Sequence, residues 1–142
     1  METGPSPSGP ARPRSGQVKP SSHTILVADA DARTRYELAY ALRGAGFQTL
    51  QADSGARALQ FAEHVSAALL DVDLADVSGV EICRVLRRTP RTATLPVIHI
   101  CAASIEHEAA MDAGADAYLP RPVDPQRLAA TVADLLARSG TL

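Results

Sequence analysis

Acidic residues directly follow two short apolar runs, and their type and spacing could do chemistry. Asp29 follows the run 25–28. Asp71 follows the run 67–70, and Asp73 lies just beyond it. If both runs are strands of one parallel sheet, their carboxyl ends meet at one edge and the carboxylates converge. Converging carboxylates need a counter-cation, and Mg²⁺ with oxygen ligands is the natural choice. Because an aspartate beside Mg²⁺ can accept a phosphoryl group, this edge is the predicted functional centre.

The elements that must position these residues alternate along the chain. Five apolar runs are separated by segments of helical spacing, which predicts a repeated strand–helix unit. Continuous apolar strands are typical of a parallel sheet covered by helices on both faces. The predicted strands are 25–28, 47–51, 67–70 running into Asp71, 96–101 and 117–119. The predicted helices are 32–43, 80–88 and 106–113, with one more capped by Asp53 or Ser54 and one that begins at Pro125 and is capped by Asp124.

Length and composition restrict the class of protein. The chain has 142 residues and a formal net charge of −2, which suits one domain and argues against direct nucleic-acid or membrane binding. Residues 1–22, rich in proline, glycine and serine, are predicted to be a disordered tail. Residues 23–138 are predicted to be one globular domain, followed by a C-terminal tail, 139–142. With no secretion signal or apolar span and two well-separated cysteines, the expected location is the cytoplasm.

Taken together, these motifs resemble the receiver domain of bacterial response regulators in two-component signalling. The resemblance covers nearly all of residues 24–138 and implies a flavodoxin-like (βα)5 doubly wound parallel sheet with strand order 2-1-3-4-5. The order of the motifs and the spacing from Asp71 to Gly79 make it specific. The matching stretches are residues 25–31, 69–74 with Gly79, 95–98, 114–119 and 121–122.

The resemblance implies a role for each site position. A histidine kinase or phosphotransfer protein would donate a phosphoryl group to Asp71, and an aromatic residue in the fifth strand, Tyr118, would move with the switch. Such a domain is not itself an enzyme. The implied Mg²⁺ site uses Asp29, Asp71 and the backbone carbonyl of Asp73, and the implied phosphoryl-binding positions are Cys101, Ala102 and Arg121.

Several site positions depart from the family pattern. Ala30 stands where a second acidic metal ligand is usual, so Mg²⁺ binding is expected to be weak or lost, and Asp31, one residue later, should point elsewhere. Cys101 replaces a hydroxyl residue and is a weaker hydrogen-bond donor. Arg121 replaces a lysine, and its planar guanidinium is not equivalent to an ammonium group. The hypothesis that the Asp73 carboxylate compensates for Ala30 follows from these changes.

Two other functions remain open beside atypical phosphorylation. One is a phosphorylation-independent interaction module. It would bind a downstream protein, or a second copy of itself, through residues 106–113, Tyr118 and residues 126–131. The remote alternative is a phosphatase, because Asp71-Val72-Asp73 resembles the DxD signature of haloacid-dehalogenase phosphatases. That class needs a lysine, and the only lysine here, Lys19, lies in the predicted tail.

The remaining candidate residues have structural interpretations. Cys83 falls on an apolar helix face and should pack there. His99 lies mid-strand and is expected to be a core histidine with satisfied hydrogen bonds. Pro122 matches a family position with a cis peptide bond. The basic helix edge made by Arg84, Arg87 and Arg88 is expected to face solvent.

Overall fold

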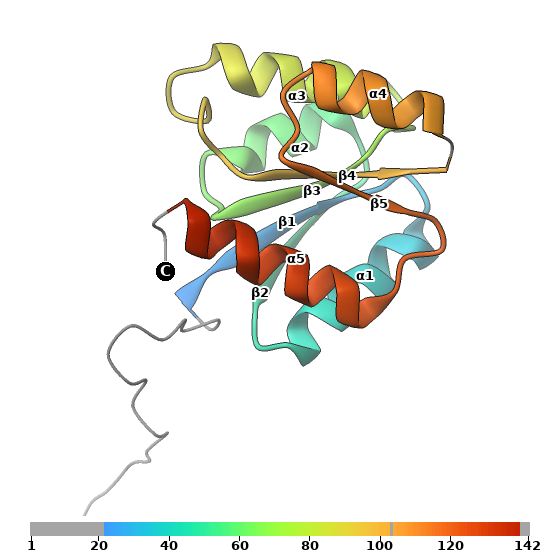
Figure 1. Cartoon of the computed structure of the whole chain (residues 1–142), viewed down its shortest axis with the longest axis vertical. Helices are drawn as coiled ribbons and strands as arrows, with labels where there is room; N and C mark the ends of the chain where they lie inside the picture. The colour runs from blue at the N-terminus through green and yellow to red at the C-terminus, as the bar shows by residue number, and fades with distance from the viewer. Residues whose placement is uncertain (1–21, 103, 140–142) are drawn as a thin grey trace, which may run out of the picture.

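The computed structural model describes residues 22–102 and 104–139, in which strands and helices alternate as predicted (Figure 1). The predicted tails 1–22 and 139–142 lie almost entirely outside these residues. No helix in the two described ranges is long and apolar enough to cross a membrane. The strands are β1 (Thr24–Ala28), β2 (Gln48–Ala52), β3 (Ala67–Asp71), β4 (Val97–Cys101) and β5 (Ala117–Pro120). The helices are α1 (Ala32–Gly44), α2 (Gly55–Ala62), α3 (Gly79–Arg88), α4 (Ser104–Asp112) and α5 (Pro125–Arg138).

The five strands form one parallel sheet in the order β2-β1-β3-β4-β5, which confirms the predicted flavodoxin-like topology. Helices α1 and α5 cover one face, and α2, α3 and α4 cover the other (Figure 1). Alternate residues of each strand enter the two halves of the core. Val27 and Leu69 pack with α1 and α5, whereas Leu26 and Leu70 pack with α2 and α3. Burial on both faces explains why β1, β3 and β4 are continuous apolar runs.

Several predicted boundaries shift by one or two residues; the fourth strand begins at Val97 rather than at 96, and the fourth helix spans Ser104–Asp112 rather than 106–113. Phe47 was predicted to begin the second strand, but its N–H bonds to the carbonyl of Leu42 at 3.1 Å and closes the end of α1. Strand β2 therefore begins at Gln48, opposite Thr24. Strand β5 extends to Pro120, which lacks an N–H and is tolerated because β5 is an edge strand. The Arg121–Pro122 peptide bond is cis, as expected.

Arg87 corrects the prediction that its helix edge simply faces solvent. Its Nε donates to the carbonyl of Gly114 at 2.9 Å, and its Nη1 donates to the carbonyl of Leu95 at 2.8 Å. Its Nη2 pairs with Asp116 at 3.0 Å, and only 21% of the side chain is exposed. Arg87 thus ties α3 to the segments that precede β4 and β5. Arg84, by contrast, pairs with Glu81 at the surface.

Gly79 is the point where α3 begins directly against the backbone of β3. A Cβ atom at this position would lie 2.1 Å from the carbonyl oxygen of Asp71 and 3.1 Å from the Cα of Val72. The Gly79 N–H also bonds to the carbonyl of Val72 at 2.9 Å. Only a residue without a side chain permits this approach. The spacing from Asp71 to Gly79 therefore has a steric cause.

Replacing Gly79 should disturb the fold around Asp71. We expect Gly79→Ala to lower the free energy of unfolding by about 1–3 kcal/mol, because the methyl group meets backbone that cannot move aside easily. The matched control is Gly44→Ala, since a Cβ there has nothing within 4 Å. In the last turn of α1 this control should raise stability by up to about 1 kcal/mol. Urea unfolding of the three proteins measures both effects, and equal changes at the two positions would contradict the steric explanation.

Candidate functional site

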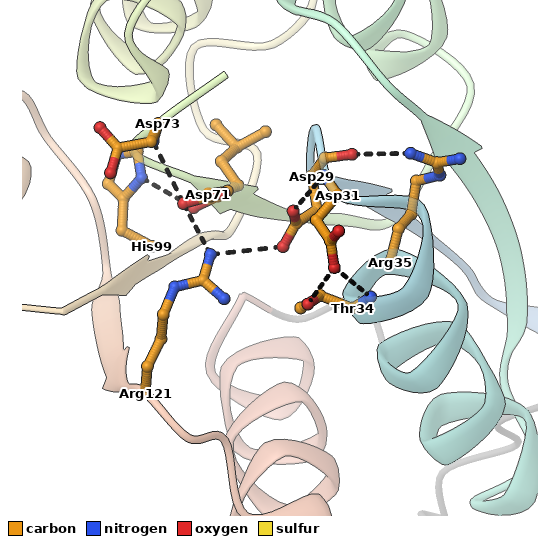
Figure 2. A network of polar contacts seen from close by, with 9 residues as sticks. Asp29, Asp31, Thr34, Arg35, Asp71, Asp73, His99 and Arg121 are labelled. Carbon is orange, nitrogen blue, oxygen red and sulfur yellow. Dashed lines mark hydrogen bonds and ion pairs between the residues drawn. The ribbon is translucent and has the colours of Figure 1, made fainter. Parts of the chain in front are cut away.

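Asp29 and Asp71 lie side by side where β1 and β3 end. The two strands pair in parallel with Ala28 opposite Leu70, so the residues that follow reach the same edge of the sheet. Both are buried, with 1% of Asp29 and 5% of Asp71 exposed. The predicted convergence of these two carboxylates is therefore confirmed (Figure 2).

Arg121 links the two carboxylates. Its Nη2 lies 2.8 Å from Oδ1 of Asp71 and 3.3 Å from Oδ2 of Asp29 (Figure 2). The residue follows β5, and its backbone N–H bonds to the carbonyl of Cys101 at 3.2 Å, which anchors it to the end of β4. A side chain from one edge of the sheet thus reaches carboxylates on the two central strands.

The electrostatics of the site reflect burial and charge pairing together. Burial raises the pKa of Asp29 above its ordinary value, and the neighbouring Asp71 carboxylate raises it further. The N–H of Asp31 and the guanidinium of Arg121 oppose this rise without cancelling it. Burial disfavours the charged form of Arg121, but its bonds to Asp71 and Asp29 outweigh that cost and raise the pKa of its guanidinium. Arg121 is therefore held in its charged form.

The other two aspartates near this edge point elsewhere. Asp31 caps α1, accepting bonds from the N–H of Thr34 at 2.8 Å and from its hydroxyl at 2.6 Å. These bonds hold the pKa of Asp31 below its ordinary value. Asp73 donates its backbone N–H to Oδ1 of Asp71 at 3.1 Å, while its carboxylate points away from Asp71 and Arg121 (Figure 2). The expectation that Asp31 points elsewhere is confirmed.

These placements bear on the metal site implied by the sequence. Of the expected side-chain ligands, Asp29 and Asp71 come together, whereas the Asp73 carboxylate, offered as a replacement for the one lost at Ala30, points away from them (Figure 2). Within residues 22–102 and 104–139, no group of three or more histidine, cysteine or acidic side chains is arranged to hold a metal. Mg²⁺ prefers a near-octahedral set of oxygen ligands. The converging side chains therefore offer Mg²⁺ only two carboxylates, a poor match to that preference, and the idea that the Asp73 carboxylate compensates for Ala30 has no geometric support.

The predicted phosphoryl-binding and switch positions lie around the same edge. Cys101 is buried at the end of β4, and Ala102 follows it at the surface. Tyr118 is partly buried on β5, opposite His99, and packs with the cluster beneath α3 and α4. Their assigned roles in phosphoryl binding and switching stay predictions.

His99 is only partly satisfied by the described residues, contrary to the expectation. Its Nδ1 lies 3.1 Å from the carbonyl of Leu70, but its buried Nε2 has no partner within them. Burial lowers the pKa of His99, so the ring is held neutral. The Leu70 contact joins the middle of β4 to the residue that precedes Asp71.

Two polar contacts around the site were missed in the sequence. Asp76, in the loop after β3, accepts bonds from the N–H groups of Gly55 at 2.7 Å and Ala56 at 3.1 Å, which lowers its pKa. It fixes that loop to the start of α2. Arg35 donates to the backbone carbonyl of Asp29 at 2.9 Å. The only sequence signal for the Asp76 contact is a loop carboxylate that can accept bonds from the start of another helix. No local pattern indicates the contact of Arg35 with Asp29.

The raised pKa of Asp29 predicts a distinctive pH dependence of stability. We expect Asp29→Asn to be more stable than the wild type near neutral pH, because the amide removes a buried charge yet still accepts the Asp31 N–H. As the pH falls through the raised pKa, the folded wild type takes up a proton before the unfolded chain does. The stability difference should therefore shrink on acidification. Urea unfolding between neutral and acidic pH measures it.

Asp31→Asn provides the control for this titration. The folded-state pKa of Asp31 is lowered, so its carboxylate stabilises the fold above its unfolded pKa and loses that effect as the pH falls. The wild type should therefore lose stability relative to Asp31→Asn on acidification, while it gains stability relative to Asp29→Asn. The same sign for both variants would contradict the assignment.

Comparison with known proteins places this geometry in a family. A family model for the response regulator receiver domain matches residues 25–133. The transcriptional regulatory protein GltR of Pseudomonas aeruginosa is 37% identical over 123 residues, covering 84% of this chain and 51% of GltR. The phosphate regulon regulator PhoB of the same organism is 34% identical over 121 residues, covering 82% of this chain and 53% of PhoB. The chain thus spans about half the length of the curated relatives it matches.

Solved structures agree with the fold and the family. The crystal structure of a protein from Chloroflexus aurantiacus, assigned as a response regulator, has a TM-score of 0.78 and 36% identity, covering 81% of this chain and 98% of that one. The receiver domain of the sensor histidine kinase PA1611 from Pseudomonas aeruginosa has a TM-score of 0.76 at 22% identity, with coverage of 81% and 98%. That protein carries a magnesium ion in its active-site cleft. The matched family model, the sequence relatives and the sheet topology together show that the chain belongs to the response regulator receiver domain family.

Proposed function

We propose that residues 23–138 form a signalling receiver in which Asp71 accepts a phosphoryl group from a histidine kinase or a phosphotransfer protein. The observation that carries this proposal is the position of Asp71. It ends the central strand β3 at the carboxyl edge of the sheet, buried yet within 2.8 Å of a guanidinium. A phosphoryl group formed there would meet a cation whose planar donors match phosphate oxygens.

The two oxygens of Asp71 have different surroundings. Oδ1 receives both the N–H of Asp73 at 3.1 Å and Nη2 of Arg121 at 2.8 Å. We assign Oδ2 as the attacking atom, because Oδ1 holds the carboxylate in place. The new P–O bond forms as the P–N bond of the donor phosphohistidine breaks, and the imidazole leaves with the bonding pair. Arg121 then turns its N–H groups to the phosphoryl oxygens.

The family supports a protein as the downstream partner. We place the contact on the surface formed by α4, β5 and α5, including residues 106–113, Tyr118 and residues 126–131. A second copy of the chain could bind through the same surface. We also place the protein in the cytoplasm, where histidine kinases deliver phosphoryl groups and where Cys83 and Cys101, which are not joined in a disulfide, would stay reduced.

A second function has an observation in its favour. The ion pairs of Arg121 already neutralise part of the buried charge of the unmodified site. Together with Ala30 and Cys101, this supports a receiver that binds its partner independently of phosphorylation. The two functions differ in one measurable property, which is whether Asp71 becomes phosphorylated.

Phosphorylation of Asp71 can be tested with acetyl phosphate in the presence of Mg²⁺. We expect the intact mass of the wild type to increase by one phosphoryl group, and Asp71→Asn to remain unmodified. Asp73→Asn is the matched control, because Asp73 contacts Asp71 only through its backbone N–H. This control should be phosphorylated at close to the wild-type level.

Two outcomes would overturn the acceptor role. A wild type that gains no mass, even after prolonged incubation, leaves the phosphorylation-independent interaction module as the function. Equal modification of the wild type and Asp71→Asn would show that another residue is the acceptor. Peptide mapping of the modified protein distinguishes Asp71 from the neighbouring aspartates.

A further inference from the structure

The acidic edge of the sheet contains its own cation. One nitrogen of Arg121 lies within 3.3 Å of a carboxylate oxygen on each of the two central strands. Asp29 and Asp71 are almost fully buried, so water solvates and screens their carboxylate charges only weakly. Adjacent buried carboxylates are costly unless a positive group lies between them. Arg121 meets this requirement from inside the chain.

Three of the four carboxylate oxygens of Asp29 and Asp71 already have partners within the chain. Oδ1 of Asp29 accepts the N–H of Asp31 at 2.9 Å, and its Oδ2 faces Arg121. Oδ1 of Asp71 accepts the N–H of Asp73 as well as the guanidinium. Ala30 offers no side-chain oxygen. A divalent cation that bridged Asp29 Oδ2 and Asp71 Oδ1 would have to displace the guanidinium, and it would be repelled by the charge of Arg121 while that side chain remained.

Arg121 is anchored in this position by its backbone and by its ion pairs. Its N–H is bonded to the carbonyl of Cys101, and its guanidinium is bonded to Asp71 and Asp29. With 31% of its side chain exposed, the guanidinium is partly sheltered from competing water. The position of the cation is therefore built into the connection between β5 and α5.

We propose that Arg121 is the resident counter-cation of this site and takes the place that a divalent metal ion would otherwise occupy. The folded site consequently does not need Mg²⁺ and binds it only weakly. This inference does not depend on whether Asp71 is phosphorylated, because it concerns the charge balance of the unmodified protein.

The test is a Mg²⁺ titration of the isotopically labelled chain, followed by the amide NMR signals of Asp29, Asp71 and Asp73. Arg121→Gln removes the cation, and we expect it to bind Mg²⁺ roughly tenfold or more tightly than the wild type, because a charge-assisted contact no longer competes. Arg35→Gln is the matched control. It removes the same charge nearby, but Arg35 contacts only the backbone carbonyl of Asp29. Its Mg²⁺ affinity should stay close to that of the wild type.

Thermal unfolding gives a second readout. Mg²⁺ should raise the unfolding temperature of Arg121→Gln at roughly tenfold lower concentration than that of the wild type, because a ligand stabilises the state that binds it in proportion to its affinity. If Arg121→Gln does not fold, Arg121→Lys replaces it, since a compact ammonium keeps a positive charge near Asp71 and leaves room beside Asp29. We expect Arg121→Lys also to bind Mg²⁺ more tightly than the wild type.

Three results would overturn the proposal. The first is equal Mg²⁺ affinity of the wild type and the Arg121 variants, including no binding by any of them. The second is an equal gain in affinity for Arg35→Gln, which would show a general effect of net charge. The third is tight Mg²⁺ binding by the wild type. Failure of acetyl phosphate to modify Asp71, with these affinities as expected, would overturn only the proposed function.

Discussion

The burial of two carboxylates at neighbouring strand ends is the constraint on which this site depends. Parallel pairing of β1 with β3 brings Asp29 and Asp71 together whether or not their charges are compatible. The sheet is covered on both faces, so the charges cannot be relieved by turning into solvent. Arg121 reaches them from the far side of β4 and balances part of the charge. The position of Arg121 thus offsets part of the free-energy cost of burying two like charges where β1 and β3 end.

The architecture could be predicted from the sequence because burial leaves a strong pattern in it. Strands covered on both faces read as unbroken apolar runs, and β1, β3 and β4 show this pattern. The edge strand β2 is less buried, and its predicted start was one residue early. That boundary is set by the hydrogen bond from the N–H of Phe47 to α1. The amino-acid composition of a strand does not indicate such a contact with the preceding helix.

The site could be predicted in position but not in its contacts. Strand ends in a parallel sheet converge, so Asp29 and Asp71 could be placed together from their spacing alone. The bond from Arg121 to Asp29 joins residues 92 positions apart, and the pair of Arg87 with Asp116 joins residues 29 apart. Such contacts depend on tertiary packing. For that reason the local sequence pattern wrongly predicted that Arg87 faces solvent. It also did not predict that the Asp73 carboxylate turns outward.

The departures of this chain from the family pattern form one consistent set when charge is considered. A further carboxylate at position 30 would add to the negative charge that a single arginine already offsets only in part. With Ala30, two buried carboxylates remain, and one guanidinium nitrogen can contact both. Arginine suits this task better than lysine, because its charge is spread over a planar group that remains protonated when partly buried. An acidic residue at position 30, or a neutral residue at position 121, would therefore each add to the net negative charge at this edge of the sheet.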